Sequence, residues 1–200
     1  MLGWQAQPVE DAVPLKRIML IRHAEKPAEG ISGVDLAGRT DDDSLSPLGW
    51  QRAGALVRFF FPPTEPNASP LSIPDAIFAT GIGPGSTSKR SVQTASPLAK
   101  LLGQSRSVPF ITKYLRNDID DLVEDVRTRE GCVLIVWEHK ALASIVEKLT
   151  SGAHRPSEWS DDCFDSVWIV DAVDWGWAFS ELSQELLPGD SPTGSDLGCI

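Results

Sequence analysis

The sequence predicts an α/β protein, a three-layer α/β/α sandwich with a mostly parallel central sheet. Short apolar runs, typical of strands buried on both faces, alternate along the chain with amphipathic stretches of helical period. The clearest run is Cys-Val-Leu-Ile-Val-Trp at residues 132–137, and a second, residues 17–21, lies near the start. Strands that alternate with helices favour a parallel sheet covered on both faces.

The other elements follow from periodicity and from turn residues. Ser46 and Pro47 open a helix that extends to Phe61, because a hydroxyl cap followed by proline is a helix-start signal. Prolines between residues 62 and 74 separate this helix from a strand at 76–79. The remaining predicted elements are helices at 90–102, 118–129 and 140–149 and strands at 108–111, 167–170 and 177–182.

Length and composition indicate one folding unit. The chain has 200 residues, of which 42% are hydrophobic, enough for one substantial core and too few for two comfortable ones. We therefore expect a single domain over residues 1–187. Residues 188–200 are rich in Gly, Pro, Ser and Asp, which predicts a flexible C-terminal tail.

Charge and cysteine content restrict the partners and the location. The formal net charge of -10 repels polyanions, so we expect neither nucleic acid nor an anionic membrane surface as a partner. There is no signal-peptide pattern and no apolar stretch of membrane-spanning length, which predicts a cytoplasmic protein. Three cysteines without a C-x-x-C spacing indicate reduced thiols. The oligomeric state stays open.

Two of the three histidines follow the two best apolar runs. Arg22 and His23 come directly after residues 17–21, and His139 comes two residues after the run 132–137. Ligands of open α/β sheets bind at the carboxyl ends of the strands, so we expect these side chains to share a site. The alternative for either histidine is a capping or core role. His154 has no partner motif and is expected at the surface or the substrate rim.

Four segments together resemble the histidine phosphatase, or phosphoglycerate mutase-like, superfamily. I-R-H-A-E-K at residues 21–26 resembles its first histidine motif, and L-S-P-L-G at 45–49 resembles its L-T-x-x-G helix start. R-S-V-Q-T-A at 90–95 resembles its R-x-x-Q-T-A helix, and V-W-E-H at 136–139 falls where the family has a second histidine. The segments occur in the family's order and cover residues 17–171.

The resemblance implies a phosphomonoester hydrolase that forms a phosphohistidine on His23. Arg22, Arg90 and His139 would surround the phosphoryl group, and a small phosphorylated metabolite is the expected substrate. This agrees with phosphoryl-transfer chemistry, which needs an in-line nucleophile and positive donors around the equatorial oxygens. Because side chains supply the positive charge and no metal-ligand spacing is present, we predict no metal and no cofactor.

The general acid and the substrate contacts are less defined. Glu138 is the first choice for the residue that protonates the leaving oxygen, since it precedes His139 at a strand end. Carboxylates that remain as alternatives are Glu25, Asp118 and Asp120. Further substrate contacts are expected from Glu25, Lys26, Ser88 and Lys89, although a solvent-facing position is an equal alternative for Ser88 and Lys89.

Two other functions fit the same residues. A mutase of this superfamily has the same catalytic set, but only residues 96–138 separate the Q-T-A helix from the second histidine here, and the resemblance implies a longer insertion in mutases. A compact connection favours water as the phosphoryl acceptor. A catalytically silent phospho-ligand-binding protein is the second alternative. The loops at 28–44 and 62–74 are expected to shape substrate choice.

Overall fold

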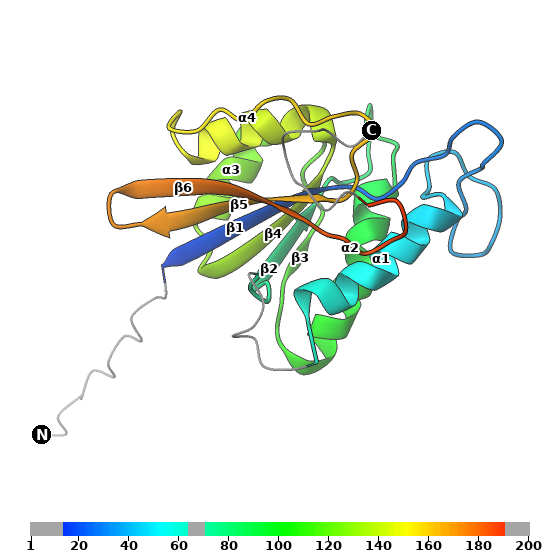
Figure 1. Cartoon of the computed structure of the whole chain (residues 1–200), viewed down its shortest axis with the longest axis horizontal. Helices are drawn as coiled ribbons and strands as arrows, with labels where there is room; N and C mark the ends of the chain where they lie inside the picture. The colour runs from blue at the N-terminus through cyan, green and yellow to red at the C-terminus, as the bar shows by residue number, and fades with distance from the viewer. Residues whose placement is uncertain (1–13, 64–70, 191–200) are drawn as a thin grey trace, which may run out of the picture.

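The fold is a six-stranded sheet between two pairs of helices (Figure 1). The computed structural model describes residues 14–63 and 71–190. Its elements are β1 (Leu15–Arg22), α1 (Pro47–Phe60), β2 (Ala76–Ala79), α2 (Arg90–Ser105), β3 (Phe110–Ile111), α3 (Ile119–Arg127), β4 (Gly131–Trp137), α4 (His139–Leu149), β5 (Ser166–Val173) and β6 (Gly176–Ser183). The predicted α/β class and the order of the elements are confirmed.

The sheet is mixed. Its order is β3-β2-β4-β1-β5-β6, with β1 to β4 parallel to one another and β5 and β6 antiparallel to their neighbours. The first four strands are joined through helices, as the sequence predicts. A connection of only Asp174 and Trp175 joins β5 to β6, and so short a link can join only antiparallel strands.

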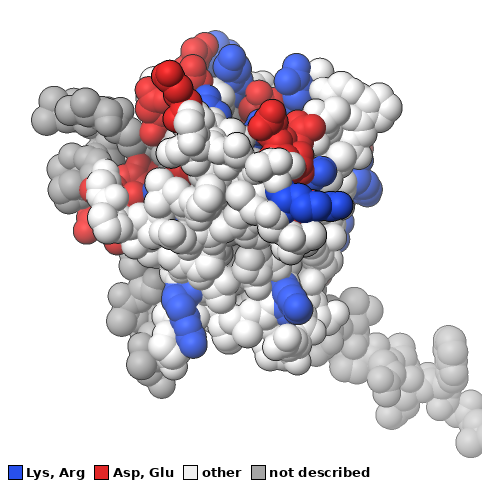
Figure 2. Space-filling model, turned by 90° about the vertical axis from the view of Figure 1, so that its right-hand side faces the viewer, with Lys and Arg blue, Asp and Glu red and all other residues white. Residues whose placement is uncertain are grey.

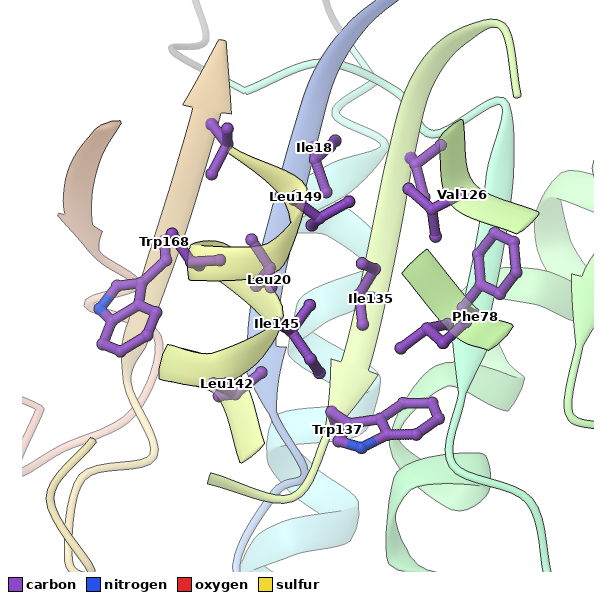
Figure 3. Packing of buried hydrophobic residues seen from close by; sticks show 14 of the residues in the cluster. Ile18, Leu20, Phe78, Val126, Ile135, Trp137, Leu142, Ile145, Leu149 and Trp168 are labelled. Carbon is purple, nitrogen blue, oxygen red and sulfur yellow. The ribbon is translucent and has the colours of Figure 1, made fainter. Parts of the chain in front are cut away.

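Alternating side chains of the central strands divide the core between the two faces. From β1, Ile18 and Leu20 pack with residues of α3 and α4, whereas Met19 and Ile21 pack with residues of α1 and α2. Figure 3 shows the first of these clusters, with Leu142 and Ile145 of α4 lying over β1 and β4. Burial on both faces explains why β1 and β4 are continuous apolar runs in the sequence.

The register places the ends of three strands at one edge of the sheet. Arg22, the last residue of β1, pairs with Trp137, the last residue of β4, and Ala79 at the end of β2 pairs with Val136. The helix predicted from residue 140 begins one residue earlier, at His139. This edge is where the sequence places its candidate catalytic residues.

The C-terminal part of the described chain is anchored. Asp190 forms an ion pair with the buried Arg52 of α1 at 2.7 Å, and its Oδ2 accepts hydrogen bonds from the backbone amides of Leu186 and Leu187. The rest of the tail predicted at 188–200, residues 191–200, lies outside the described residues.

One cysteine departs from the expectation of reduced thiols. Cys163 is disulfide-bonded, so the expectation is wrong for this residue. Cys132 is a free, half-buried thiol. Among the described residues, no helix has the length and apolar character needed to cross a membrane.

Candidate active site

Strand ends and helix starts converge at the carboxyl edge of the parallel strands. His23 follows β1, Thr80 follows β2 and Glu138 follows β4, while α2 begins at Arg90 and α4 at His139. The positive end of a helix dipole lies at its N-terminus, so both helices favour an anion at this edge. Figure 2 looks onto this end of the molecule and shows positive and negative side chains interspersed in its upper half.

His23 is a buried, neutral imidazole. The residue is 6% exposed, and its Nδ1 lies 2.8 Å from the carbonyl oxygen of Ala24. Because a carbonyl oxygen only accepts, Nδ1 carries the proton and Nε2 keeps its lone pair. Burial, assisted by the positive charges of Arg22 and Arg90, lowers the pKa of His23 to about 3. The ring is therefore unprotonated throughout the physiological pH range, with the lone pair of Nε2 available.

Arg22 is fixed by the loop that precedes β5. Its Nη1 donates to the backbone carbonyls of Ser160, Asp161 and Cys163 at 3.2, 2.5 and 3.1 Å, and its guanidinium lies 4.0 Å from the ring centroid of Phe164. Burial lowers the pKa of Arg22 to about 10, partly opposed by nearby carboxylates. The side chain remains positive at neutral pH and has little freedom to move.

Arg90 and His139 are the other two predicted phosphate-binding residues. Nη1 of Arg90 donates to the backbone carbonyl of Asp42 at 3.1 Å, and burial lowers the pKa of its guanidinium. His139 is also buried; burial and the charge of Arg22 lower its pKa, opposed by the carboxylate of Asp161. That carboxylate is in ion-pair contact with Nε2 of His139, while Nδ1 has no hydrogen-bond partner among the described residues.

Several buried polar atoms at this edge have no hydrogen-bond partner among the described residues. They are Nε of Arg22, Nε of Arg90, Oγ1 of Thr80 and Nδ1 of His139. Buried donors without a partner are rare in folded proteins, because each costs about 1–3 kcal/mol. An anion bound at this edge would accept hydrogen bonds from the buried donors of Arg22, Arg90 and Thr80.

The Q-T-A motif orients the segment that holds the nucleophile. Thr94 Oγ1 accepts a hydrogen bond from the amide of Ala24 at 2.9 Å and donates to the carbonyl of Arg90 at 2.8 Å. Gln93 Oε1 accepts from the amide of Leu45 at 2.8 Å. These contacts join β1, α2 and the start of α1, which explains why residues of these types stand at these positions.

A cavity of about 200 Å³ opens beside His23. Of the predicted site residues it is lined by His23, Arg90, Glu138 and Ser88. Other side chains on its wall, which the sequence analysis did not identify, are Asp43, Thr80, Ser86, Thr87, Ser91 and Arg116. Thr80 was detectable, since it follows a predicted strand, whereas Arg116 stands in a loop with no distinguishing pattern.

Three of the predicted substrate contacts do not line this cavity. Glu25 turns toward α1, where its Oε1 pairs with Arg52 Nη2 at 2.8 Å. Lys89 is paired with Asp41 at 2.7 Å, and Lys26 is exposed. For Lys89 the two neighbours in sequence, Ser88 and Arg90, line the cavity instead.

Two of the alternative general acids also lie elsewhere. The Asp118 carboxylate accepts a hydrogen bond from the amide of Leu115 at 2.9 Å and so stabilises the turn before α3. Asp120 is exposed and pairs with Lys148 of α4 at 2.6 Å. Of the four carboxylates proposed from the sequence, only Glu138 lines the cavity of His23.

Comparison with known proteins rests on structure alone. No protein-family model matches the sequence, and no curated protein matches it. The SixA protein of Agrobacterium tumefaciens, assigned as a phosphohistidine phosphatase, superposes with a TM-score of 0.50 at 18% identity over 84% of this chain and 98% of its own. A protein histidine phosphatase SixA in complex with tungstate superposes with a TM-score of 0.51 at 14% identity, over 84% and 97%.

The chain has the histidine phosphatase fold. Both matched structures are covered almost end to end, so the likeness extends over the whole of those proteins. The predicted phosphoglycerate mutase-like architecture is thereby confirmed, with the difference that the sheet is mixed. At identities of 14 and 18% the likeness concerns the fold, and the chemistry has to be argued from the residues of this chain.

Proposed function

We propose that this chain is a phosphomonoester hydrolase of the histidine phosphatase superfamily, which transfers the phosphoryl group of a small phosphorylated metabolite to Nε2 of His23 without a metal ion. The observation that carries the proposal is the state of His23. It is neutral and buried, and it lines a cavity together with Arg90 and Thr80, whose buried Nε and Oγ1 have no hydrogen-bond partner among the described residues.

In the first step the lone pair of Nε2 attacks phosphorus. The N–P bond forms as the P–O bond to the leaving group breaks, and the negative charge on the equatorial oxygens is stabilised by Arg22, Arg90 and His139. Glu138, in its protonated form, gives the leaving oxygen its proton. His23 then holds the phosphoryl group on Nε2 while Nδ1 keeps its hydrogen bond to Ala24.

In the second step water attacks the phosphohistidine. The Glu138 carboxylate takes one proton from the attacking water, the N–P bond breaks, and inorganic phosphate leaves. Nε2 of His23 recovers its lone pair and Glu138 its proton, so the enzyme returns to its starting state. Glu138 is suited to both roles because it lines the cavity and its side chain is 31% exposed, which gives it access to water.

Hydrolysis is favoured over transfer to a second substrate by the connection between α2 and α4. That connection consists of β3, α3, β4 and their loops and carries no inserted subdomain that could enclose a substrate. The complex of the structurally similar protein histidine phosphatase SixA with tungstate, a tetrahedral oxyanion, supports an oxyanion site in this fold.

The test is hydrolysis of an aryl phosphate in the presence of EDTA by the full chain and by His23→Gln. We expect turnover that EDTA leaves unchanged and that the variant loses. His154→Gln is the matched control, since His154 Nε2 contacts the carbonyl of Trp177 at 2.6 Å and does not line the cavity. Brief incubation with labelled substrate should leave a phosphoenzyme that is labile in acid and stable in alkali.

Two results would contradict the proposal. Loss of turnover with EDTA and recovery with a divalent cation would replace the side-chain mechanism by a metal-dependent one. Absence of turnover from folded protein that nevertheless binds tungstate would favour a phospho-ligand-binding protein without catalysis.

A further inference from the structure

The cation Arg116 on the wall of the cavity takes no part in the mechanism above. It lines the same cavity as His23, Arg90 and Glu138, and its side chain is 50% exposed. Within the described residues its guanidinium makes no hydrogen bond, and the nearest carboxylate oxygen, Oε2 of Glu138, lies 3.8 Å away. A pair at this distance and exposure contributes little stability.

The backbone at Arg116 is nevertheless held firmly. The indole Nε1 of the fully buried Trp137 donates to the carbonyl of Arg116 at 3.2 Å. On the preceding residue, the amide of Leu115 donates to the carboxylate of Asp118 at 2.9 Å, and the carbonyl of Leu115 accepts from the amide of Asp118 at 3.0 Å. A long, uncommitted cation on a fixed backbone is a typical arrangement for recognition of a ligand.

Neighbouring cations are already engaged. Lys89 pairs with Asp41 at 2.7 Å, and Lys113, three residues before Arg116, pairs with Asp125 at 3.1 Å. Neither of them lines the cavity. Arg116 is therefore the cation on this wall that is available beyond those assigned to the phosphoryl group.

We propose that Arg116 determines specificity by binding a second anionic group, a carboxylate or a phosphate, on the leaving portion of the substrate. This inference rests on the proposed function and names its substrate class: small phosphomonoesters with a second negative charge. The planar guanidinium matches the two oxygens of either group. Arg116 would then turn from Glu138 toward the substrate, which leaves Glu138 available as proton donor.

The test uses two-carbon phosphomonoesters that differ only in the second group. Ethyl phosphate carries no charge there, phosphoglycolate a carboxylate, ethanediol bisphosphate a phosphate and phosphoethanolamine an ammonium. We expect kcat/KM of the full chain to be higher for phosphoglycolate, for the bisphosphate or for both than for ethyl phosphate. The expected ratio is roughly tenfold to a hundredfold, the range of a charge-assisted hydrogen bond. Phosphoethanolamine should be no better than ethyl phosphate.

Variants assign that preference to Arg116. Arg116→Gln should abolish it, because kcat/KM should fall by a larger factor for phosphoglycolate and the bisphosphate than for ethyl phosphate, and Arg116→Lys should retain part of it. Lys113→Gln removes the same charge from the same loop outside the cavity and should preserve the preference. The inference is overturned if the wild type shows no such preference in kcat/KM, if Arg116→Gln keeps the preference, or if Lys113→Gln loses it equally. It is also overturned if Arg116→Gln lowers kcat/KM equally for all four substrates.

A binding measurement separates this inference from the proposed function. Calorimetric titration of His23→Ala with the same four compounds, with and without Arg116→Gln, requires no turnover. If the wild type hydrolyses none of them, the proposed hydrolase fails, yet tighter binding of phosphoglycolate or the bisphosphate that depends on Arg116 still supports the inference. Equal affinities for ethyl phosphate and its charged analogues overturn it.

Discussion

Nδ1 of His23 donates a hydrogen bond to the carbonyl oxygen of Ala24, the next residue in the chain, at 2.8 Å. This contact fixes both the tautomer and the direction of the ring, because only Nε2 is then free to react. The amide of the same Ala24 is held by Thr94 Oγ1. His23, the proposed nucleophile, is thus oriented by the backbone of Ala24 and, through Ala24, by one side chain of α2.

The low pKa of His23 predicts an unusual pH dependence for a histidine nucleophile. Because that pKa is about 3, the neutral ring persists under acidic conditions, and kcat for an aryl phosphate with a good leaving group should stay nearly constant from pH 7 to pH 5. For an ordinary histidine of pKa near 6.5, the neutral fraction would fall about 25-fold over this interval. Stopped-flow measurement of phosphoenzyme formation checks this, and a fall of that size would contradict the assigned state.

The same pKa shift predicts a loss of stability in acid. The folded-state pKa of His23 lies below the unfolded value of 6.5, so unfolding takes up a proton between these two values and acid favours the unfolded state. The contribution of His23 is complete above pH 6.5 and is lost as the pH falls, at up to about 1.4 kcal/mol per unit. By pH 5 the free energy of unfolding should have fallen by about 2 kcal/mol from this residue.

Urea unfolding of the wild type and of His23→Gln at pH 5 to 7 isolates this contribution. Glutamine does not titrate. The unfolding free energy of His23→Gln should therefore fall less than that of the wild type, by about 2 kcal/mol at pH 5. Carboxylates titrate in both proteins, and their effect cancels in the difference. Parallel curves would show that His23 is not a buried neutral group in the folded protein.

The sequence predicted which edge of the sheet holds the candidate catalytic residues, because these residues directly follow recognisable strands. Arg22, His23 and His139 follow the two most apolar runs, and runs buried on both faces can only be central strands of one sheet. Their carboxyl ends must then meet if the strands are parallel. The sequence predicted a mostly parallel sheet, and the strands that depart from it are β5 and β6, which the two-residue hairpin at Asp174 and Trp175 makes antiparallel to each other.

Other features of the site left no trace in the sequence. The segment before β5 binds Arg22 through the backbone carbonyls of Ser160, Asp161 and Cys163, and any residue supplies a carbonyl. Lys89 and Arg90 are adjacent cations at the start of one helix, yet only Arg90 lines the cavity. The local sequence does not show which of the two cations faces the cavity. Lys89 faces away because it pairs with Asp41, which a distant loop places beside it.

Thr94→Val should impair both stability and catalysis. Valine has nearly the same shape but offers no oxygen, so the buried amide of Ala24 loses its partner, at a cost of about 1–3 kcal/mol in unfolding free energy. Since Ala24 also orients His23, kcat should fall roughly tenfold or more. Thr94→Ser keeps the hydroxyl and should remain close to wild type in both measurements. Unchanged kcat in Thr94→Val would remove Thr94 from the positioning of the nucleophile.

The buried ion cluster around Arg52 predicts a large stability effect away from the cavity. Arg52 pairs with Glu25 and with Asp190, and all three side chains are largely buried. Arg52→Met leaves two carboxylates without their cation and should lower the unfolding free energy by about 3–5 kcal/mol. Arg39→Met is the matched control, since the side chain of Arg39 is 79% exposed and its pair with Asp35 should contribute less than about 1 kcal/mol. Similar losses in both variants would contradict the role of burial.

His139 predicts proton uptake when an anion binds. In the ligand-free protein burial and Arg22 lower its pKa, whereas a bound dianion would raise it, so binding at pH 7 should draw in up to about one proton per site. Calorimetric titration with tungstate in buffers of different ionisation enthalpy measures this number directly. His139→Gln, which keeps a donor but cannot titrate, should bind more weakly and take up less. Equal uptake in both proteins would assign the proton to another group and would leave His139 without the charge that the mechanism requires of it.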